Sequence, residues 1–470
     1  MIAALAALAI VLQDHTPLRA EPRSGATELA ELWQGEVLEV RGQRADYYQV
    51  YDYARERGGY LSIRALRQVS LGEADAPELL AVRRFLRDLP GSEALGISYG
   101  AAYLKAAPPR TLTAEPFYAI ATMAQRLADQ ATGSGPGAGA HTAEVGAHIE
   151  VAGQFGVHLR SFNRNGRVQV CYDGELFRSA LAQTGASAEE RAGAVLGLTR
   201  PECIDPDLGP AARAAFDGER RDLLEQVGEQ GLTDVTRSRL HARRAAVWAA
   251  IAFERARVRE PADAAAQHAL GELRSVRPTD LGDDGRTEYA DAAIRVSTIR
   301  WALGADPAAA SPLALGATAG EPGQTCLVLT DAARSRNSEV ARRCTYGVPW
   351  MRSVRSIPGA RALALAVQPL ESWLELWVFR ERAGSWTVDV ISPGAEDPEQ
   401  GYVEFAGYVP RSRRLLVVRE AREHGRLHRR FEELRLADLT PVLEAGAPEL
   451  LPEFGRWQDP LWRRDTLALR

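Results

Sequence analysis

Residues 9–70 alternate between hydrophobic and polar positions over short stretches, which are separated by residues typical of turns. Aromatic and β-branched side chains are frequent in these stretches, and both kinds favour extended strands. Five such stretches in so short a segment predict a small antiparallel β-barrel. The expected strands lie at 10–12, 30–33, 37–40, 47–51 and 59–61.

From about residue 72 to 305 the apolar residues recur with the period of an amphipathic helix. This spacing predicts an α-helical bundle, with the almost entirely apolar stretch 245–253 at its centre. One β-hairpin is expected inside it, because 157–162 and 168–172 flank Asn165-Gly166, a strong turn signal. The expected helices lie near 77–86, 116–129, 189–199, 210–228, 235–258, 261–275 and 287–303.

Beyond residue 320 short strand-like stretches return, and six of the nine tryptophans lie between Trp350 and Trp462. The stretch 362–365 resembles 414–417, and 386–388 resembles 439–442, so two similar sheets are expected. They fit a sandwich, or sheets like propeller blades, although two blades are too few to close a propeller. The expected strands lie at 326–330, 362–367, 373–379, 386–391, 402–409, 415–418 and 432–436.

These patterns predict a multidomain α+β protein in three parts. A small β-barrel is expected over 9–71, a central α-helical bundle over 72–310, and an antiparallel β-rich domain over 320–470. The glycine-rich stretch 133–140 predicts a flexible break within the helical part.

The apolar run 2–12 is too short to span a bilayer, and it has the length of the hydrophobic region of a signal peptide. Ala7-Leu8-Ala9 has the form of a cleavage site, although no basic residue precedes Arg19. Residues 1–8 are therefore interpreted as the remnant of a signal peptide. The alternative is that the end of the run is the first buried strand. No integral membrane segment is expected.

The chain contains four cysteines, which allow three disulfide connectivities. Each cysteine is expected to bond to its nearest neighbour in the sequence, because the intervening loops are then short. The expected bridges are Cys171–Cys203 and Cys326–Cys344. The alternative is four reduced thiols buried in the core. Disulfides together with the apolar start predict a periplasmic or secreted protein.

The charge distribution excludes several functions. Acidic residues outnumber basic ones by 62 to 57, and the net charge of -5 provides no general attraction to nucleic acid. Lys105 is the only lysine, so the chain has no phosphate-binding P-loop. No CxxC or HExxH motif occurs, and no cofactor or metal is expected. The basic run from Arg237 to Arg244 is interpreted as a solvated helix end.

Four segments of the predicted barrel resemble the bacterial SH3-like (SH3b) domain. The segments are 18–25, 32–37, 48–50 and 59–61, with Gly35 at a tight turn before a strand. Pro17 and Tyr60 replace the usual Asn and Trp, and 52–57 lengthens one hairpin. The resemblance implies a small SH3-like β-barrel that binds peptides or peptidoglycan through an aromatic-lined groove.

The resemblance also implies which side chains line that groove. Aromatic rings are supplied by Tyr47, Tyr48, Tyr51, Tyr53 and Tyr60, and only some of them share one face because side chains alternate along a strand. Arg19 or Arg23 is expected to pair with ligand carboxylates. Trp33 is interpreted as a core residue.

Catalytic motifs are weak. Gly96-Ile97-Ser98-Tyr99-Gly100 matches G-x-S-x-G, but no strand precedes it as a nucleophile elbow requires. The motif is interpreted as a bend between helices. Neither Cys171 nor Cys203 begins the Cys-Ser-Gly segment of cysteine peptidases of the cell wall.

The sequence therefore predicts a non-catalytic cell-envelope protein that binds or scaffolds, with peptidoglycan or an envelope protein as the partner. One alternative is an envelope hydrolase with an unrecognised active site. Another is a structural partner of a secretion or cell-wall assembly.

Overall fold

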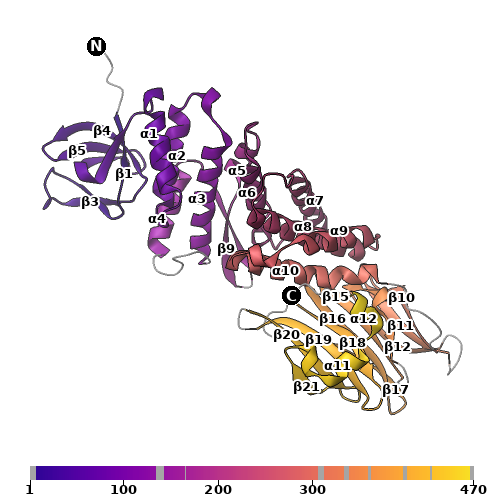
Figure 1. The fold of residues 1–470 in the computed structure, drawn as a ribbon. Coiled ribbons are helices and arrows are strands. Elements are labelled where there is room, and N and C mark those ends of the chain that lie inside the picture. The colour runs from indigo at the N-terminus through magenta and orange to yellow at the C-terminus, as the bar shows by residue number, and fades with distance from the viewer. Residues whose placement is uncertain are drawn as a thin grey trace. The chain divides into compact units, whose positions relative to one another are not determined.

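The chain forms two compact units (Figure 1). Unit 1 comprises Met1–Leu208 and Leu223–Leu232, and unit 2 comprises Gly209–Asp222 and Thr233–Arg470. The expected α+β class is confirmed, since N-terminal strands are followed by helices and then by further sheets. The computed structural model describes residues 7–133, 142–164, 166–304, 312–332, 338–357, 361–394, 400–423 and 426–465.

Unit 1 begins with a seven-stranded antiparallel sheet, which we call the N-terminal sheet. Its strand order is β3-β2-β6-β5-β4-β1-β7. The five expected strands are present, and the sequence pattern missed β2 and β7, which contain only four residues each. The strands are β1 (Ala7–Val11), β2 (Thr16–Arg19), β3 (Glu28–Leu32), β4 (Val37–Arg44), β5 (Tyr47–Asp52), β6 (Arg57–Ser62) and β7 (Leu66–Val69).

All seven strands contribute to one hydrophobic core, because alternate residues of each strand point to the same side. The most buried members are Ala9, Val11, Leu18, Leu32, Leu38, Val50, Leu61 and Leu66. The turn before β4 has Gly35 in the left-handed region at φ 91°, as the sequence predicted. A Cβ there would lie 2.7 Å from the carbonyl oxygen of Ala94, so only glycine permits this close approach to the next helices.

The first strand accounts for residues 7–11 of the apolar run 2–12. Residues 7–11 form β1, which pairs with β4 and β7 and is buried from Ala9 to Val11. The predicted cleavage motif at 7–9 lies within this strand. The rest of the predicted signal-peptide remnant, residues 1–6, lies outside the described residues.

Six α-helices and a hairpin follow in the described part of unit 1 (Figure 1). Ile10 of β1 packs with Leu79, Leu86 and Tyr103 of the first two helices, which joins the N-terminal sheet to the helices. The hairpin is confirmed, with Gly166 at φ 76° in its turn. The elements are α1 (Ala76–Leu86), α2 (Glu93–Ala106), α3 (Ala114–Thr132), α4 (Thr142–Gly153), β8 (Leu159–Arg164), β9 (Arg167–Tyr172), α5 (Glu175–Leu181) and α6 (Ala188–Leu198).

The predicted bend at residues 96–100 is wrong, because the whole motif lies inside α2. Its glycines instead allow α2 to pack closely on α3. A Cβ on Gly96 would lie 2.4 Å from Sδ of Met123, and one on Gly100 would lie 2.5 Å from Cγ1 of Ile120. The spacing of four residues places both glycines on one helix face.

Unit 1 contains the first disulfide. Cys171 of β9 is bonded to Cys203, which ends a short 3-10 helix at Pro201–Cys203. The bridge therefore ties the hairpin to the segment that follows α6. The flexible break predicted at 133–140 begins at Gly133, which ends α3 in the left-handed conformation. The other residues of the predicted break, 134–140, lie outside the described residues.

The helices of unit 2 pack against each other through small side chains. Ala245, Ala249 and Phe253 of α8 lie in one core with α9 and α10, which confirms a central place for the apolar stretch. Small residues let helix axes approach closely, so the core is dense in alanine. The helices are α7 (Pro210–Glu225), which the division between units crosses, α8 (Asp234–Arg257), α9 (Asp263–Ser275), α10 (Asp283–Ile299), α11 (Pro452–Trp457) and α12 (Pro460–Asp465).

Two sheets complete unit 2. A three-stranded sheet has the order β10-β11-β12, and a nine-stranded sheet follows the path β13-β15-β16-β18-β19-β20-β21, with β14 on β15 and β17 on β16. The strands are β10 (Leu313–Ala319), β11 (Thr325–Asp331), β12 (Glu339–Thr345), β13 (Val348–Pro349), β14 (Arg355–Ser356), β15 (Ala362–Leu370), β16 (Trp373–Arg382), β17 (Ser385–Ile391), β18 (Gly401–Val409), β19 (Arg414–Glu423), β20 (Arg426–Arg435) and β21 (Pro441–Ala445).

The two similar stretches of sequence lie in two antiparallel meanders, β15-β16-β17 and β19-β20-β21. They belong to one sheet rather than to two, because the start of β16 pairs in parallel with β18. One cluster nevertheless joins Ala364 and Val378 of the first meander to Val417 and Leu434 of the second. The second disulfide, Cys326–Cys344, joins β11 to β12.

The predicted boundaries near 71 and between 310 and 320 fall where the secondary structure changes, and they stay predictions as domain boundaries. Helices α1–α6 belong to unit 1 with the N-terminal sheet, whereas α8–α10 belong to unit 2.

Candidate functional sites

The outer face of the N-terminal sheet brings four of the seven predicted groove residues together. Arg19 of β2 pairs with Tyr60 of β6, and Tyr60 pairs with Gln49 of β5. Tyr47 and Tyr51 lie two residues to either side of Gln49 and so point to the same face. They are diagonal neighbours of Tyr60, at about 7–8 Å for such positions. We call Arg19, Tyr47, Tyr51 and Tyr60 the tyrosine face.

Tyr48 is not part of this face. It pairs with Leu61 and packs against the core with Val50. The reason is the two-residue period of a strand, which turns Tyr48 inward when Tyr47 and Tyr51 point outward.

The tyrosine face carries two further charged residues that the sequence reasoning missed. Arg41 places its guanidinium 3.9 Å from the ring centroid of Tyr51, and its Nε donates to Oε2 of Glu39 at 2.8 Å. Tyr53 stacks edge-on to Tyr51 at 5.0 Å and donates to the same carboxylate. The hydrogen bond from Arg41 is the main reason that the pKa of Glu39 lies below its usual value. The sequence signal for this pair was the spacing of Glu39 and Arg41, which are two residues apart on β4 and so lie on the same face.

The two predicted carboxylate-binding arginines differ in position. Arg19 donates from Nη1 to the carbonyl oxygen of Ala26 at 3.0 Å, which anchors its side chain beside Tyr60. Arg23 lies in the following turn, is exposed, and pairs with Glu21 at 2.7 Å. Only Arg19 therefore belongs to the tyrosine face.

Trp33 is half-buried and lies in a polar cluster rather than in the sheet core. Its ring is 4.6 Å from that of His15 and 6.3 Å from that of His148. Asp14 accepts hydrogen bonds from Gln34, and His148 Nε2 lies 2.8 Å from Asp14 Oδ1. Burial opposes the charge of Asp14, but these partners outweigh it, and the pKa of Asp14 lies below its usual value.

Ser98 does not have the geometry of a nucleophile. It lies in the middle of α2, is 1% exposed, and its Oγ has no hydrogen-bond partner within the described residues. A serine nucleophile requires an adjacent base and access for a substrate. The motif is explained by helix packing.

The second half of the basic run on α8, His241 to Arg244, is buried, so its interpretation as a solvated helix end is wrong there. Arg243 Nε pairs with Glu288 Oε1 at 2.6 Å, and His241 Nδ1 lies 2.6 Å from Glu272 Oε2. Buried charges require such partners because isolated ions are costly to desolvate. The Arg243–Glu288 ion pair joins α8 to α10, the His241–Glu272 hydrogen bond joins α8 to α9, and both contacts are structural.

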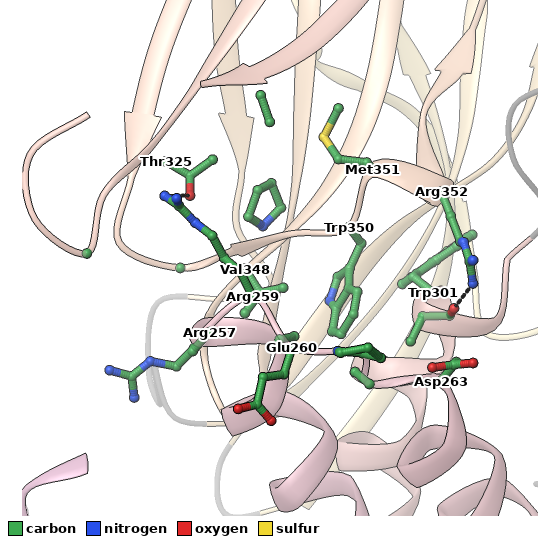
Figure 2. A pocket seen from close by; sticks show the side chains of 18 residues that line it. Arg257, Arg259, Glu260, Asp263, Trp301, Thr325, Val348, Trp350, Met351 and Arg352 are labelled. Carbon is green, nitrogen blue, oxygen red and sulfur yellow. Dashed lines mark hydrogen bonds between the residues drawn. The ribbon is translucent and has the colours of Figure 1, made fainter. Parts of the chain in front are cut away.

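Unit 2 contains a cleft of about 590 Å³, shown in Figure 2. We call it the tryptophan cleft, because Trp301 and Trp350 lie in its wall and both are at least nine-tenths buried. Its size suits a small ligand or a few side chains of a partner. It is bordered by the α8–α9 turn, the ends of β10 and β11, and β13. The charged residues that line it are Arg257, Arg259, Glu260, Asp263 and Arg352.

Within the described ranges, no cluster of side chains has the composition of a metal site, and no helix is long and apolar enough to cross a membrane. Comparisons with models of protein families, with curated proteins and with solved structures gave no match to this chain. The functional interpretation therefore depends on the geometry of the two sites described above.

Proposed function

We propose that the N-terminal sheet is an SH3-like barrel of the bacterial type and that the tyrosine face binds the peptide part of peptidoglycan or a similar short peptide. The main support for this proposal is the strand register, which places Tyr60 between Tyr47 and Tyr51 and next to Arg19. The chain as a whole would then be a non-catalytic protein that binds or scaffolds at the cell envelope.

The chemistry of the tyrosine face supports a peptide ligand. Tyrosine rings provide rigid apolar area together with hydroxyl groups, which is typical of surfaces that bind peptides. Arg19 uses one guanidinium nitrogen for the backbone, and the other donors suit a carboxylate. Arg41 and Glu39 border the face and set its local charge.

The two disulfides support a place for the protein in the periplasm or outside the cell. Structural disulfides form and persist in oxidising compartments, and both bridges join segments of regular or nearly regular structure. An envelope ligand for the tyrosine face is consistent with such a location.

The proposal is tested by sedimentation of the full chain with purified peptidoglycan. Tyr60→Ala is expected to reduce the bound fraction about tenfold or more, since central aromatic residues dominate such interfaces. Gln49→Glu is the second variant, because it places a negative charge at an exposed position between the tyrosines without removing a ring.

Phe85→Ala is the matched control, since Phe85 is an exposed aromatic residue of the same unit on α1. The wild type and this control should sediment equally with peptidoglycan. The proposal would be refuted if the wild type did not bind peptidoglycan, or if Tyr60→Ala and Gln49→Glu both bound it as well as the wild type does.

A further inference from the structure

One side of the tryptophan cleft carries an arginine in a conformation that favours glycine. Helix α8 ends in a Schellman arrangement, in which the N–H of Arg259 donates to Ala256 O at 3.0 Å and that of Glu260 to Arg255 O at 2.8 Å. Arg259 has φ 61°. A non-glycine residue in this region costs roughly 1–2 kcal/mol, so the fold alone does not favour arginine here.

The side chain of Arg259 reaches across the cleft. Its Nη2 donates to the carbonyl oxygen of Gln324 at 3.2 Å and lies 3.4 Å from Oγ1 of Thr325 (Figure 2). No carboxylate within the described residues pairs with it. A guanidinium at a cleft that contacts only neutral oxygens is well suited to donate hydrogen bonds to a ligand carboxylate.

The apolar wall of the cleft is rigid. Trp350 is held by a 3.0 Å hydrogen bond from its Nε1 to Oε1 of Gln368. Trp301 packs in the same core as Trp350, and its own Nε1 has no hydrogen-bond partner among the residues that the structure describes. Figure 2 shows Trp350 between Arg259 and Arg352. An apolar side chain of a ligand would lose its water here without any rearrangement of the wall.

One wall of the cleft includes a residue of β10, which is an edge strand among the described residues. This residue is Ala317. Ala332 donates to Pro312 O and Gly320 donates to Gln324 O, so the even-numbered residues of β10 make the bonds to β11. The alternation of an antiparallel pair then turns the N–H and C=O groups of Leu315, Ala317 and Ala319 to the edge that faces away from β11.

This edge lacks the usual protection against a further strand. The sequence of β10 is LALGATA, which contains no charged residue and no proline. Edge strands are commonly blocked by such residues, because open N–H and C=O groups bind extended chains. Within the described residues no strand pairs with this side of β10.

We propose that unit 2 binds an extended, acidic peptide of a partner protein by strand addition to β10. The peptide backbone pairs with Leu315 and Ala317, an apolar side chain fills the tryptophan cleft, and a carboxylate meets Arg259. A saccharide would use the tryptophans but not the row of backbone groups on β10, which is why a peptide is favoured. This site is separate from the tyrosine face.

The first experiment selects peptides from a random phage-displayed library on the full chain. Enriched peptides should combine acidic and apolar residues, and their affinity is then measured by fluorescence polarisation. Arg259→Gly is expected to weaken binding tenfold to a hundredfold, the range for the loss of a charge-assisted hydrogen bond. The same variant should melt at the same or a higher temperature, because glycine relieves the positive φ.

Two further variants separate strand addition from simple cleft binding. Ala317→Pro removes an N–H that faces the free edge and leaves the bonds to β11 in place, so it should abolish binding with little change in melting temperature. Ala317→Ser should bind like the wild type. Arg286→Ala is the control for charge, since Arg286 is exposed on α10 and does not line the cleft.

Three outcomes would overturn the proposal. The first is that no peptides are enriched. The second is that neither Arg259→Gly nor Ala317→Pro affects peptide binding. The third is that the chain binds a saccharide on a glycan array instead of a peptide, and that Arg259→Gly abolishes this saccharide binding. Loss of peptide binding in Tyr60→Ala but not in Arg259→Gly would assign the peptide to the tyrosine face and also refute it.

Discussion

The glycines of α2 set how closely this helix approaches α3. At Gly100 an added Cβ would lie 2.5 Å from Cγ1 and 2.7 Å from Cδ1 of Ile120, which is buried and β-branched. We expect Gly100→Ala to destabilise the protein by about 1–2 kcal/mol, since overpacking costs roughly 1–3 kcal/mol and alanine regains up to about 1 kcal/mol of helix propensity. Chemical denaturation measures this difference.

Gly271→Ala is the matched control in another helix. Nothing lies within 4 Å of a Cβ built at Gly271 in α9, and the residue is exposed. The substitution should therefore stabilise the protein by about 0.5–1 kcal/mol. If both variants gained stability, the close packing of α2 on α3 would be wrong.

His15 is expected to titrate above its usual range. Its Nδ1 lies 2.8 Å from Glu31 Oε1 and its Nε2 lies 3.3 Å from Glu144 Oε1, and these hydrogen bonds, Glu31 first, raise the pKa of His15. These contacts of protonated His15 therefore stabilise the folded state fully at a pH below the pKa of His15 in the unfolded chain, about 6.5. This stabilisation is lost as the pH rises through the pKa of His15 in the folded protein. An NMR titration of the ring should show the raised pKa.

Glu31→Gln should lower the pKa of His15, whereas Glu28→Gln on the same strand should not change it. Asp14 behaves in the opposite sense, because its pKa is lowered. Its contribution to stability is present above its unfolded pKa and is lost as the pH falls through the folded one. An unshifted His15 would contradict the described contacts between β3, α4 and the turn of His15.

The structure shows which residues of the predicted groove share a face, and their function as a site stays a prediction. Tyr47, Tyr51, Tyr60 and Arg19 share a face, but Tyr48 points inward. Sequence alternation shows that neighbours diverge, but it does not say which member of a run of aromatic residues faces the core. Only the pairing of β5 with β6 decides this, because Tyr48 is opposite the buried Leu61.

At the scale of single elements, the Cys171–Cys203 bridge holds the β8–β9 hairpin. The bridge closes a separation of 32 residues. We expect the double variant Cys171→Ala/Cys203→Ala to lose roughly 3–4 kcal/mol, the loop-closure entropy for this length. Amide hydrogen exchange should become faster in β8 and β9, while β11 and β12 in unit 2 stay protected.

The double variant Cys326→Ala/Cys344→Ala is the reciprocal control, since that bridge joins β11 to β12. Its faster exchange should be confined to the three-stranded sheet. Equal exchange in the wild type and in each variant would show that the bridges do not stabilise these elements.

Long elements with a clear period were predictable from sequence, and short ones were not. The pattern located α3, α8 and α9 closely, because several turns repeat the apolar spacing. It missed β2 and β7, which contain four residues each, and the helical conformation of residues 96–100 in α2, where two glycines indicate a bend. Glycine lowers helix propensity, but packing against α3 outweighs that cost.

For the whole molecule, all four cysteines are expected to be oxidised. Both bridges are formed in the structure, so alkylation of the denatured chain without reductant should modify no cysteine. Prior reduction should expose all four. Modification of purified native protein without reduction would contradict the bridges and would remove the support for an oxidising compartment.

The sequence by itself determined the class of the protein and the order of its parts, and it favoured the local pairing of its cysteines. These follow from local period, length and spacing, which are properties of neighbouring residues. Tertiary structure alone decided which tyrosines face outward, that Ser98 is buried, and that Ala317 of the edge strand β10 lines the tryptophan cleft. Each of these depends on contacts between segments far apart in the chain, and no local pattern encodes such contacts.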